Sequence, residues 1–197
     1  MKQIDAWKML CDDIGGNFLV SKHFKIPRVE LIYKNFLFCL DTYTVSTGKS
    51  TMTFTRMRAM FINKEEFAFK IYKEGFFAKI GKFFGMEDIE IGDEMVDKKL
   101  IIKSENEFLI KDLLAKEDIR QKLKEIKYIN LCIEKKLYEN KEHLYKESVL
   151  NQTQVGIIKD VELLKSWYYL FAAIIDGMTE LDITMDTAPE NVIFKEK

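Results

Sequence analysis

Two arginines in this chain have a spacing that suits ligand binding. Arg56 and Arg58 lie in a run that reads as a β-strand, where alternate residues share one face of the sheet. Two guanidinium groups on one face can clamp a carboxylate or a phosphate through paired N–H donors. The alternative is a structural role, in which both arginines pair with acids on the neighbouring strand, such as Asp41.

The tripeptide Gly48-Lys49-Ser50 matches only the end of a phosphate-binding P-loop. The full pattern requires a glycine five residues before Gly48, and this chain has Tyr43 there. A strand is expected after the tripeptide, whereas a P-loop leads into a helix whose N-terminus holds the phosphates. We therefore interpret the segment as a hairpin turn and expect it to bind neither ATP nor GTP.

The remaining residue types that could do chemistry form no recognisable site. Acids gather over residues 87–97, but their spacing does not fit an EF-hand, so we expect a solvated acidic face. The cysteines and histidines show neither metal-ligand spacing nor a nucleophile beside a base. They are Cys11, Cys39, Cys132, His23 and His143. We predict reduced, slowly reacting thiols, no metal, no cofactor and no catalytic residue.

Composition restricts the class of protein. The chain has 197 residues, 47% of them hydrophobic and 32% charged, with a net charge of -1. We expect one domain over residues 1–183 and a polar tail over 184–197. The near-neutral charge argues against general nucleic-acid binding. A secretory pattern and an 18-residue apolar window are both missing from the sequence, so we expect a cytoplasmic protein.

The arginines should be positioned by a hairpin of residues 36–45 and 51–62, within an α+β fold. Strands run together instead of alternating with helices, which predicts a largely antiparallel curved sheet. This sheet should pack on a long C-terminal helix, residues 158–180, with an N-terminal helix and a mid-chain helix pair. Ser104 and Glu107 have the spacing of a capping box. Further strands are expected at 18–20, 29–33, 67–72, 88–91, 99–103, 129–133, 137–138 and 144–150.

A phenylalanine-rich segment, residues 75–85, is the most distinctive stretch of the sequence. If it is helical, its apolar side chains form one face. They are Phe76, Phe77, Ile80, Phe83 and Phe84. Such a face is either buried in the fold or exposed as a contact surface for a partner or a membrane. We predict burial, because nearby acids weaken the attraction of the adjacent lysines to an anionic lipid surface.

Motifs spread over residues 36–180 support a resemblance to a known group of sequences. They are LDTYTVSTGKS (40–50), TRMRA (55–59), GFF (75–77), IGK (80–82), FGM (84–86), DIEIGD (88–93), IIK (101–103) and GIIKDV (156–161). Together they resemble a family of uncharacterised bacterial conserved hypothetical proteins of the domain-of-unknown-function type. That family has no established activity, so the resemblance implies no cofactor and no site residue.

The sequence therefore favours a non-enzymatic cytoplasmic binding or interaction module. Its partner would be an unknown protein or a small hydrophobic ligand, with weak membrane-surface contact as a further alternative and the oligomeric state left open. The candidate interaction or anion-binding residues are Arg56, Arg58, Phe76, Phe77 and Phe84. One alternative is a carrier with a cavity between the sheet and the C-terminal helix, and another is an enzyme without a recognisable motif. The cavity would be lined by Trp167, Tyr168, Phe171 and Met178.

Burial of the phenylalanine-rich segment is tested by Phe84→Asp. A buried phenylalanine contributes about 1.5–3 kcal/mol of apolar transfer free energy. The variant should therefore melt at a lower temperature or become insoluble. A variant with wild-type stability that no longer floats with liposomes, or that loses an oligomeric state, would contradict burial and locate an interaction surface.

Overall fold

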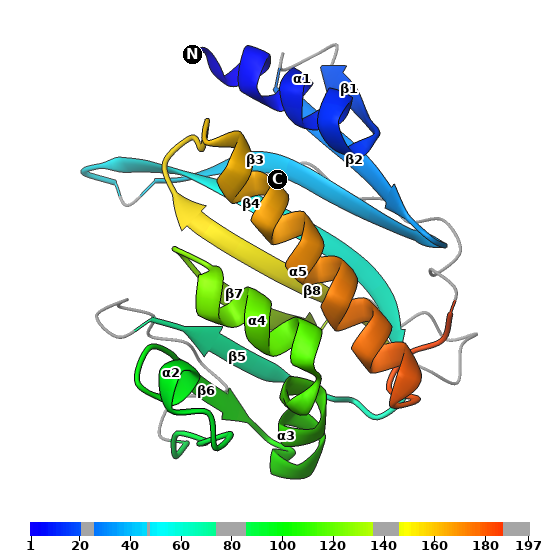
Figure 1. Cartoon of the computed structure of the whole chain (residues 1–197). Helices are drawn as coiled ribbons and strands as arrows, with labels where there is room; N and C mark the ends of the chain where they lie inside the picture. The colour runs from blue at the N-terminus through cyan, green and yellow to red at the C-terminus, as the bar shows by residue number, and fades with distance from the viewer. Residues whose placement is uncertain (21–25, 47, 74–85, 136–145, 187–197) are drawn as a thin grey trace.

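The computed structural model describes residues 1–20, 26–46, 48–73, 86–135 and 146–186. It shows an eight-stranded antiparallel sheet in the order β1-β2-β3-β4-β8-β7-β5-β6, with α1, α4 and α5 over one face (Figure 1). The strands are β1 (Gly16–Val20), β2 (Pro27–Tyr33), β3 (Phe36–Ser46), β4 (Thr51–Asn63), β5 (Phe69–Tyr72), β6 (Ile101–Ser104), β7 (Asn130–Lys135) and β8 (Lys146–Val155). The helices are α1 (Gln3–Ile14), α2 (Glu94–Asp97), α3 (Glu107–Ala115), α4 (Glu117–Glu125) and α5 (Val161–Glu180). The predicted α+β class, with its antiparallel sheet, is confirmed.

The predicted hairpin forms from β3 and β4, which pair from Ser46 opposite Thr51 to Phe38 opposite Ala59. Successive β4 side chains alternate between the two faces of the sheet. The set that includes Met57 is buried towards α5, whereas Arg56 and Arg58 point the other way. We call the face opposite the helices the distal face.

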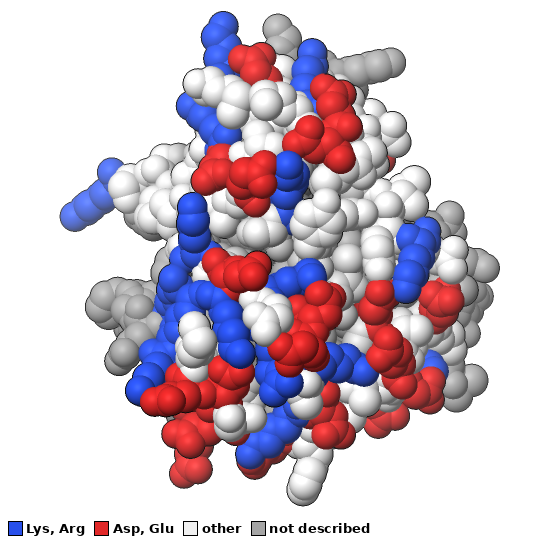
Figure 2. Space-filling model, viewed as in Figure 1, with Lys and Arg blue, Asp and Glu red and all other residues white. Residues whose placement is uncertain are grey.

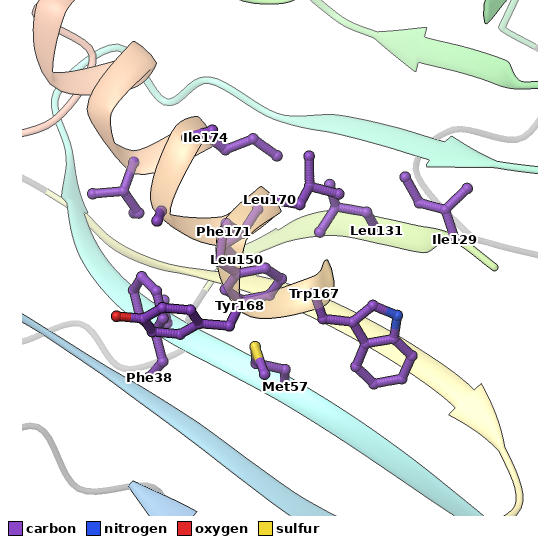
Figure 3. Close-up of a cluster of buried hydrophobic side chains, with 14 of the residues drawn as sticks. Phe38, Met57, Ile129, Leu131, Leu150, Trp167, Tyr168, Leu170, Phe171 and Ile174 are labelled. Carbon is purple, nitrogen blue, oxygen red and sulfur yellow. The ribbon is translucent and has the colours of Figure 1, made fainter. Parts of the chain in front are cut away.

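Helix α5 covers the centre of the sheet and is buried along most of its length. The Asp160 side chain caps it by accepting a hydrogen bond from the backbone N–H of Leu163. In Figure 3, Trp167 and Phe171 point from α5 towards the central strands. The Phe171 ring meets Phe38 of β3 edge to face, with the ring centroids 5.6 Å apart. This contact between helix and sheet forms the centre of the hydrophobic core.

A buried hydroxyl fixes the connection between β8 and α5. The Thr55 Oγ1 atom donates to the carbonyl oxygen of Gly156 at 2.7 Å and accepts from the Ile158 N–H at 2.9 Å. The Ile158 carbonyl in turn accepts from the Trp7 Nε1 of α1 at 3.0 Å. Because these backbone groups are held by tertiary contacts, α5 begins at Val161, three residues after the predicted start.

The cap of α3 differs from the prediction. Asn106, and not Ser104, is the N-cap residue, and its side chain accepts from the Leu109 N–H at 3.1 Å. Ser104 is the last residue of β6, and its hydroxyl donates to the carbonyl oxygen of Ala68 at 2.7 Å. Both residue types cap helices well, so the strand pairing of Ser104 decided between them.

The prediction of a strand at residues 88–91 is also wrong. The Ile89 N–H donates to the Ile102 carbonyl at 2.8 Å, but no ladder follows it. Instead, the Asp97 carboxylate accepts from the backbone N–H groups of Ile91 and Gly92, each at 3.0 Å. The short helix α2 was not predicted, and the Asp93 carboxylate caps it. Acidic side chains therefore take the bonds that a neighbouring strand would have supplied.

The end of β8 and the start of the C-terminal tail also differ from the predicted boundaries. Strand β8 continues past Leu150 to Val155, where its sequence becomes polar. At the start of the expected polar tail, Thr184 is buried and forms an isolated bridge with Asn63. The predicted strand at 137–138 lies outside the described residues.

We call the two hydrogen bonds of the Thr55 hydroxyl, to Gly156 and Ile158, the Thr55 clamp. It predicts a large loss of stability in Thr55→Val. Valine keeps the shape and the strand propensity of threonine, but it leaves the Gly156 carbonyl and the Ile158 N–H without their partner. At about 1–3 kcal/mol for each of the two buried unsatisfied groups, the free energy of unfolding should fall by roughly 2–6 kcal/mol. Denaturant unfolding measures this change.

Thr53→Val is the matched control on the same strand. The Thr53 hydroxyl shares one exposed hydrogen bond with the Thr44 hydroxyl at 3.2 Å, so little stability should be lost. Equal effects of the two substitutions would contradict the clamp.

Candidate functional site: a polar network on the distal face

Polar side chains form a row across the distal face. The strand register places Arg58 of β4 opposite Asn151 of β8, Asn151 opposite Cys132 of β7, and Cys132 opposite Lys70 of β5. Neighbouring strands are about 4.8 Å apart, so the row from Arg58 to Lys70 is roughly 14 Å long. Four chain segments distant in the sequence thus bring their polar groups to one surface.

The arginine cluster lies at one end of this row and consists of Asp41, Tyr43, Arg56 and Arg58. The Asp41 carboxylate accepts from Arg56 Nε and Arg56 Nη2, at 2.6 and 3.1 Å, and from Arg58 Nη2 at 2.6 Å. Both arginine side chains are 12% exposed. The Arg56 guanidinium also lies 4.7 Å from the centre of the Tyr43 ring. The structural pairing with Asp41, which was the alternative interpretation, is therefore what the structure shows.

Burial affects the charge of this cluster. It lowers the pKa of the Arg58 guanidinium, and the Asp41 carboxylate opposes that effect. Because an arginine stays protonated well above neutral pH, the Arg58 guanidinium remains cationic. Asp41 thus holds two positive groups in a fixed arrangement.

The lysine cluster lies at the other end of the row and consists of Lys70, Tyr72, Cys132, Glu134 and Asn151. Lys70 is only 2% exposed. Its ammonium nitrogen lies 5.0 Å from the centre of the Tyr72 ring, and among the described residues it forms neither an ion pair nor a hydrogen bond. Burial lowers the pKa of Lys70, an effect that Cys132 and Glu134 partly oppose.

In the middle of the row, only one of the two polar atoms of the Asn151 amide has a hydrogen-bond partner. Asn151 Nδ2 donates to Glu134 Oε1 at 2.8 Å, whereas Asn151 Oδ1 is buried without a hydrogen-bond partner. Glu134 is exposed, so the lysine cluster reaches solvent at that side. Buried polar atoms are normally paired, and an unpaired one indicates a missing water or ligand.

The three cysteines are free thiols with little nucleophilic character. Burial raises the pKa of Cys39 to about 12. It raises the pKa of Cys132 to about 12 as well, and the Glu134 carboxylate acts in the same direction. The pKa of Cys11 is also raised by burial. Thiols attack as thiolates, so these groups are poor nucleophiles at neutral pH.

The other predicted site residues fall in different places. Phe76, Phe77 and Phe84 lie outside the described residues. The proposed cavity residues Trp167, Phe171 and Met178 are fully buried in the core. Four of the acids within 87–97 bond to the backbone or to lysine, such as Asp93 to Lys124 at 2.7 Å; they are Asp88, Asp93, Glu94 and Asp97. No group of three or more metal-ligating side chains occurs within the described part of the chain.

Sequence reasoning missed Lys70, Cys132, Glu134 and Asn151. The alternation within residues 67–72 and 129–133 could have placed Lys70 and Cys132 on a sheet face. It could not show that they are partners, because partner strands are not encoded in either segment alone. Asn151 lies in the part of β8 beyond the predicted strand.

The helix-covered side of the molecule has a different character. There, basic and acidic side chains are interspersed, most densely over α3 and α4 (Figure 2). A field of mixed sign gives no broad attraction to an anionic polymer. The distal face is therefore the better candidate for a specific site.

Comparison with known proteins gives no relative: no family model, no curated protein and no solved structure matches the chain. A search of the described helices finds none long and apolar enough to cross a membrane. Function is therefore inferred from the geometry of the polar network.

The raised thiol pKa values predict slow labelling of Cys39 and Cys132 by an aromatic disulfide at pH 7.5. An exposed cysteine has a pKa near 8.5, so a pKa of about 12 lowers the thiolate fraction roughly a thousandfold. Because the thiolate is the reacting form, labelling should speed up about tenfold per pH unit while the protein stays folded. Mass spectrometry of timed samples identifies the labelled residue. Fast labelling of Cys132 at pH 7.5 would contradict the raised pKa and favour the enzyme alternative.

Proposed function

We propose that this protein is a binding module that recognises an anionic group of its ligand, a carboxylate or a phosphate, on the distal face of the sheet. One observation is central: Lys70 is 2% exposed and has no hydrogen bond or ion pair among the described residues. A cation that is largely removed from water and has no ion pair is destabilising. An anion at the ammonium group would offset this cost.

The arginine cluster supports the same ligand class. Asp41 and the Tyr43 ring hold the Arg56 guanidinium in place before any ligand arrives. A side chain fixed in advance loses little conformational entropy on binding. The cluster and Lys70 lie at opposite ends of one row, so an anion between them is attracted from both sides.

Binding is favoured over the two alternatives. The enzyme alternative gains no support from Cys39 or Cys132, because burial raises the pKa of both thiols. The carrier alternative needs aromatic side chains that face an empty space. Instead, the Tyr168 and Phe171 rings contact the Phe38 ring, with centroids 5.7 and 5.6 Å apart.

Lys70→Met tests the proposal, because it should not lower stability without an anion but should abolish the stabilisation that an added anion gives. Methionine keeps an unbranched side chain but removes the buried charge, so without added anion the variant should be at least as stable as the wild type. Inorganic phosphate and acetate, added at constant ionic strength, should raise the melting temperature of the wild type only. A tenfold excess of anion over its dissociation constant should add about 1.4 kcal/mol of stability.

Lys111→Met is the matched control. Lys111 lies on α3 and pairs with Glu107 at 2.6 Å on the surface, so its loss should leave the anion response unchanged. Calorimetry with phosphate gives the affinity of each protein directly. The proposal fails if neither anion stabilises the wild type, or if Lys70→Met keeps the full response.

A further inference from the structure

The orientation of the Asn151 amide is fixed by its partner. The Asn151 nitrogen faces Glu134 Oε1, at 2.8 Å, because an ionised carboxylate accepts hydrogen bonds and cannot donate them. The oxygen, Oδ1, therefore points elsewhere, and it is buried without a partner. Asn151 is 7% exposed, so solvent reaches this residue poorly.

The partner that Asn151 Oδ1 lacks must be a hydrogen-bond donor. The residues around Oδ1 disfavour a positively charged donor. Asn151 is the direct strand partner of Arg58, and Lys70 lies two strands away on the other side of it. An ammonium group at this point would be repelled by a cation on each side. A neutral O–H is the donor that fits best.

A second acceptor lies beside the first. Asn130 begins β7, two residues before Cys132, so it is the diagonal neighbour of Asn151. Its Nδ2 donates to Thr153 Oγ1 at 2.7 Å, and its Oδ1 is also buried without a partner. Diagonal neighbours in a sheet are about 7–8 Å apart, a distance that a ligand of a few heavy atoms can bridge.

We infer that the ligand is a small hydroxylated organic anion, such as a polyol phosphate or a hydroxy acid. Its anionic group binds at Lys70, and its hydroxyl groups donate to Asn151 Oδ1 and Asn130 Oδ1. Two strand spacings, roughly 10 Å, separate the Lys70 and Asn151 backbones, a span that the two ends of such a molecule can bridge. This inference rests on the proposed anion-binding function and narrows its ligand class.

The test compares two ligands of equal charge by calorimetry with the full chain. Glycerol 3-phosphate has two hydroxyl groups that propyl phosphate lacks. The wild type should bind glycerol 3-phosphate at least about fivefold more tightly, the lower bound for two neutral hydrogen bonds. In Asn151→Ala this preference should fall by about two- to twelvefold, the contribution of one neutral hydrogen bond, while the bond to Asn130 remains and propyl phosphate binds as before. Glu134 loses its amide partner in this variant, but it is exposed and can be hydrated.

The outcomes separate the inference from the function on which it rests. Equal, measurable binding of both phosphates to the wild type overturns the inference and leaves the anion site intact. No binding of either phosphate overturns both. If Asn151→Ala does not fold, the comparison of the two phosphates on the wild type still tests the inference, because it needs no variant.

Discussion

The packing of α5 against the centre of the sheet is the contact on which the rest of this structure depends. Strands β3, β4 and β8 each present buried side chains to the helix, among them Phe38, Met57 and Leu150 (Figure 3). Without that contact the sheet would expose an apolar face too large for a stable domain in water. The Thr55 clamp ties the start of α5 to the same strands.

This packing also decides the character of the distal face. Side chains alternate along each strand, so covering one face with helices assigns every second residue to the other face. On the distal face, a small separate apolar cluster built around Cys39 and Met60 accompanies the polar row. The charged and amide groups are therefore concentrated in a surface that the main core does not need. A sheet face of this kind can be specialised for binding without loss of the core.

The polar row combines satisfied and unsatisfied groups, and that combination is informative. Asp41 is bonded to both Arg56 and Arg58, which makes the arginine cluster a fixed support. The Asn151 oxygen is buried without a partner, and among the described residues the Lys70 ammonium group contacts only the Tyr72 ring. Natural proteins keep buried, unpaired polar groups where a ligand completes them, because each one lowers stability when it is left alone. The anion-binding proposal follows from this contrast.

The sequence by itself determined the α+β class, the β3–β4 hairpin and the long C-terminal helix, since periodicity and turn residues are local signals. It also identified Arg56 and Arg58 as a pair and Asp41 as their candidate partner. Only the tertiary structure decided that Ser104 pairs in the sheet while Asn106 caps α3. It also decided that the predicted strand at 88–91 does not form and that Asp93 caps the short helix α2 after it. It alone placed Lys70 and Asn151 in one row with Arg58. Strand order depends on which distant segments share one hydrophobic core, and no single segment contains that information.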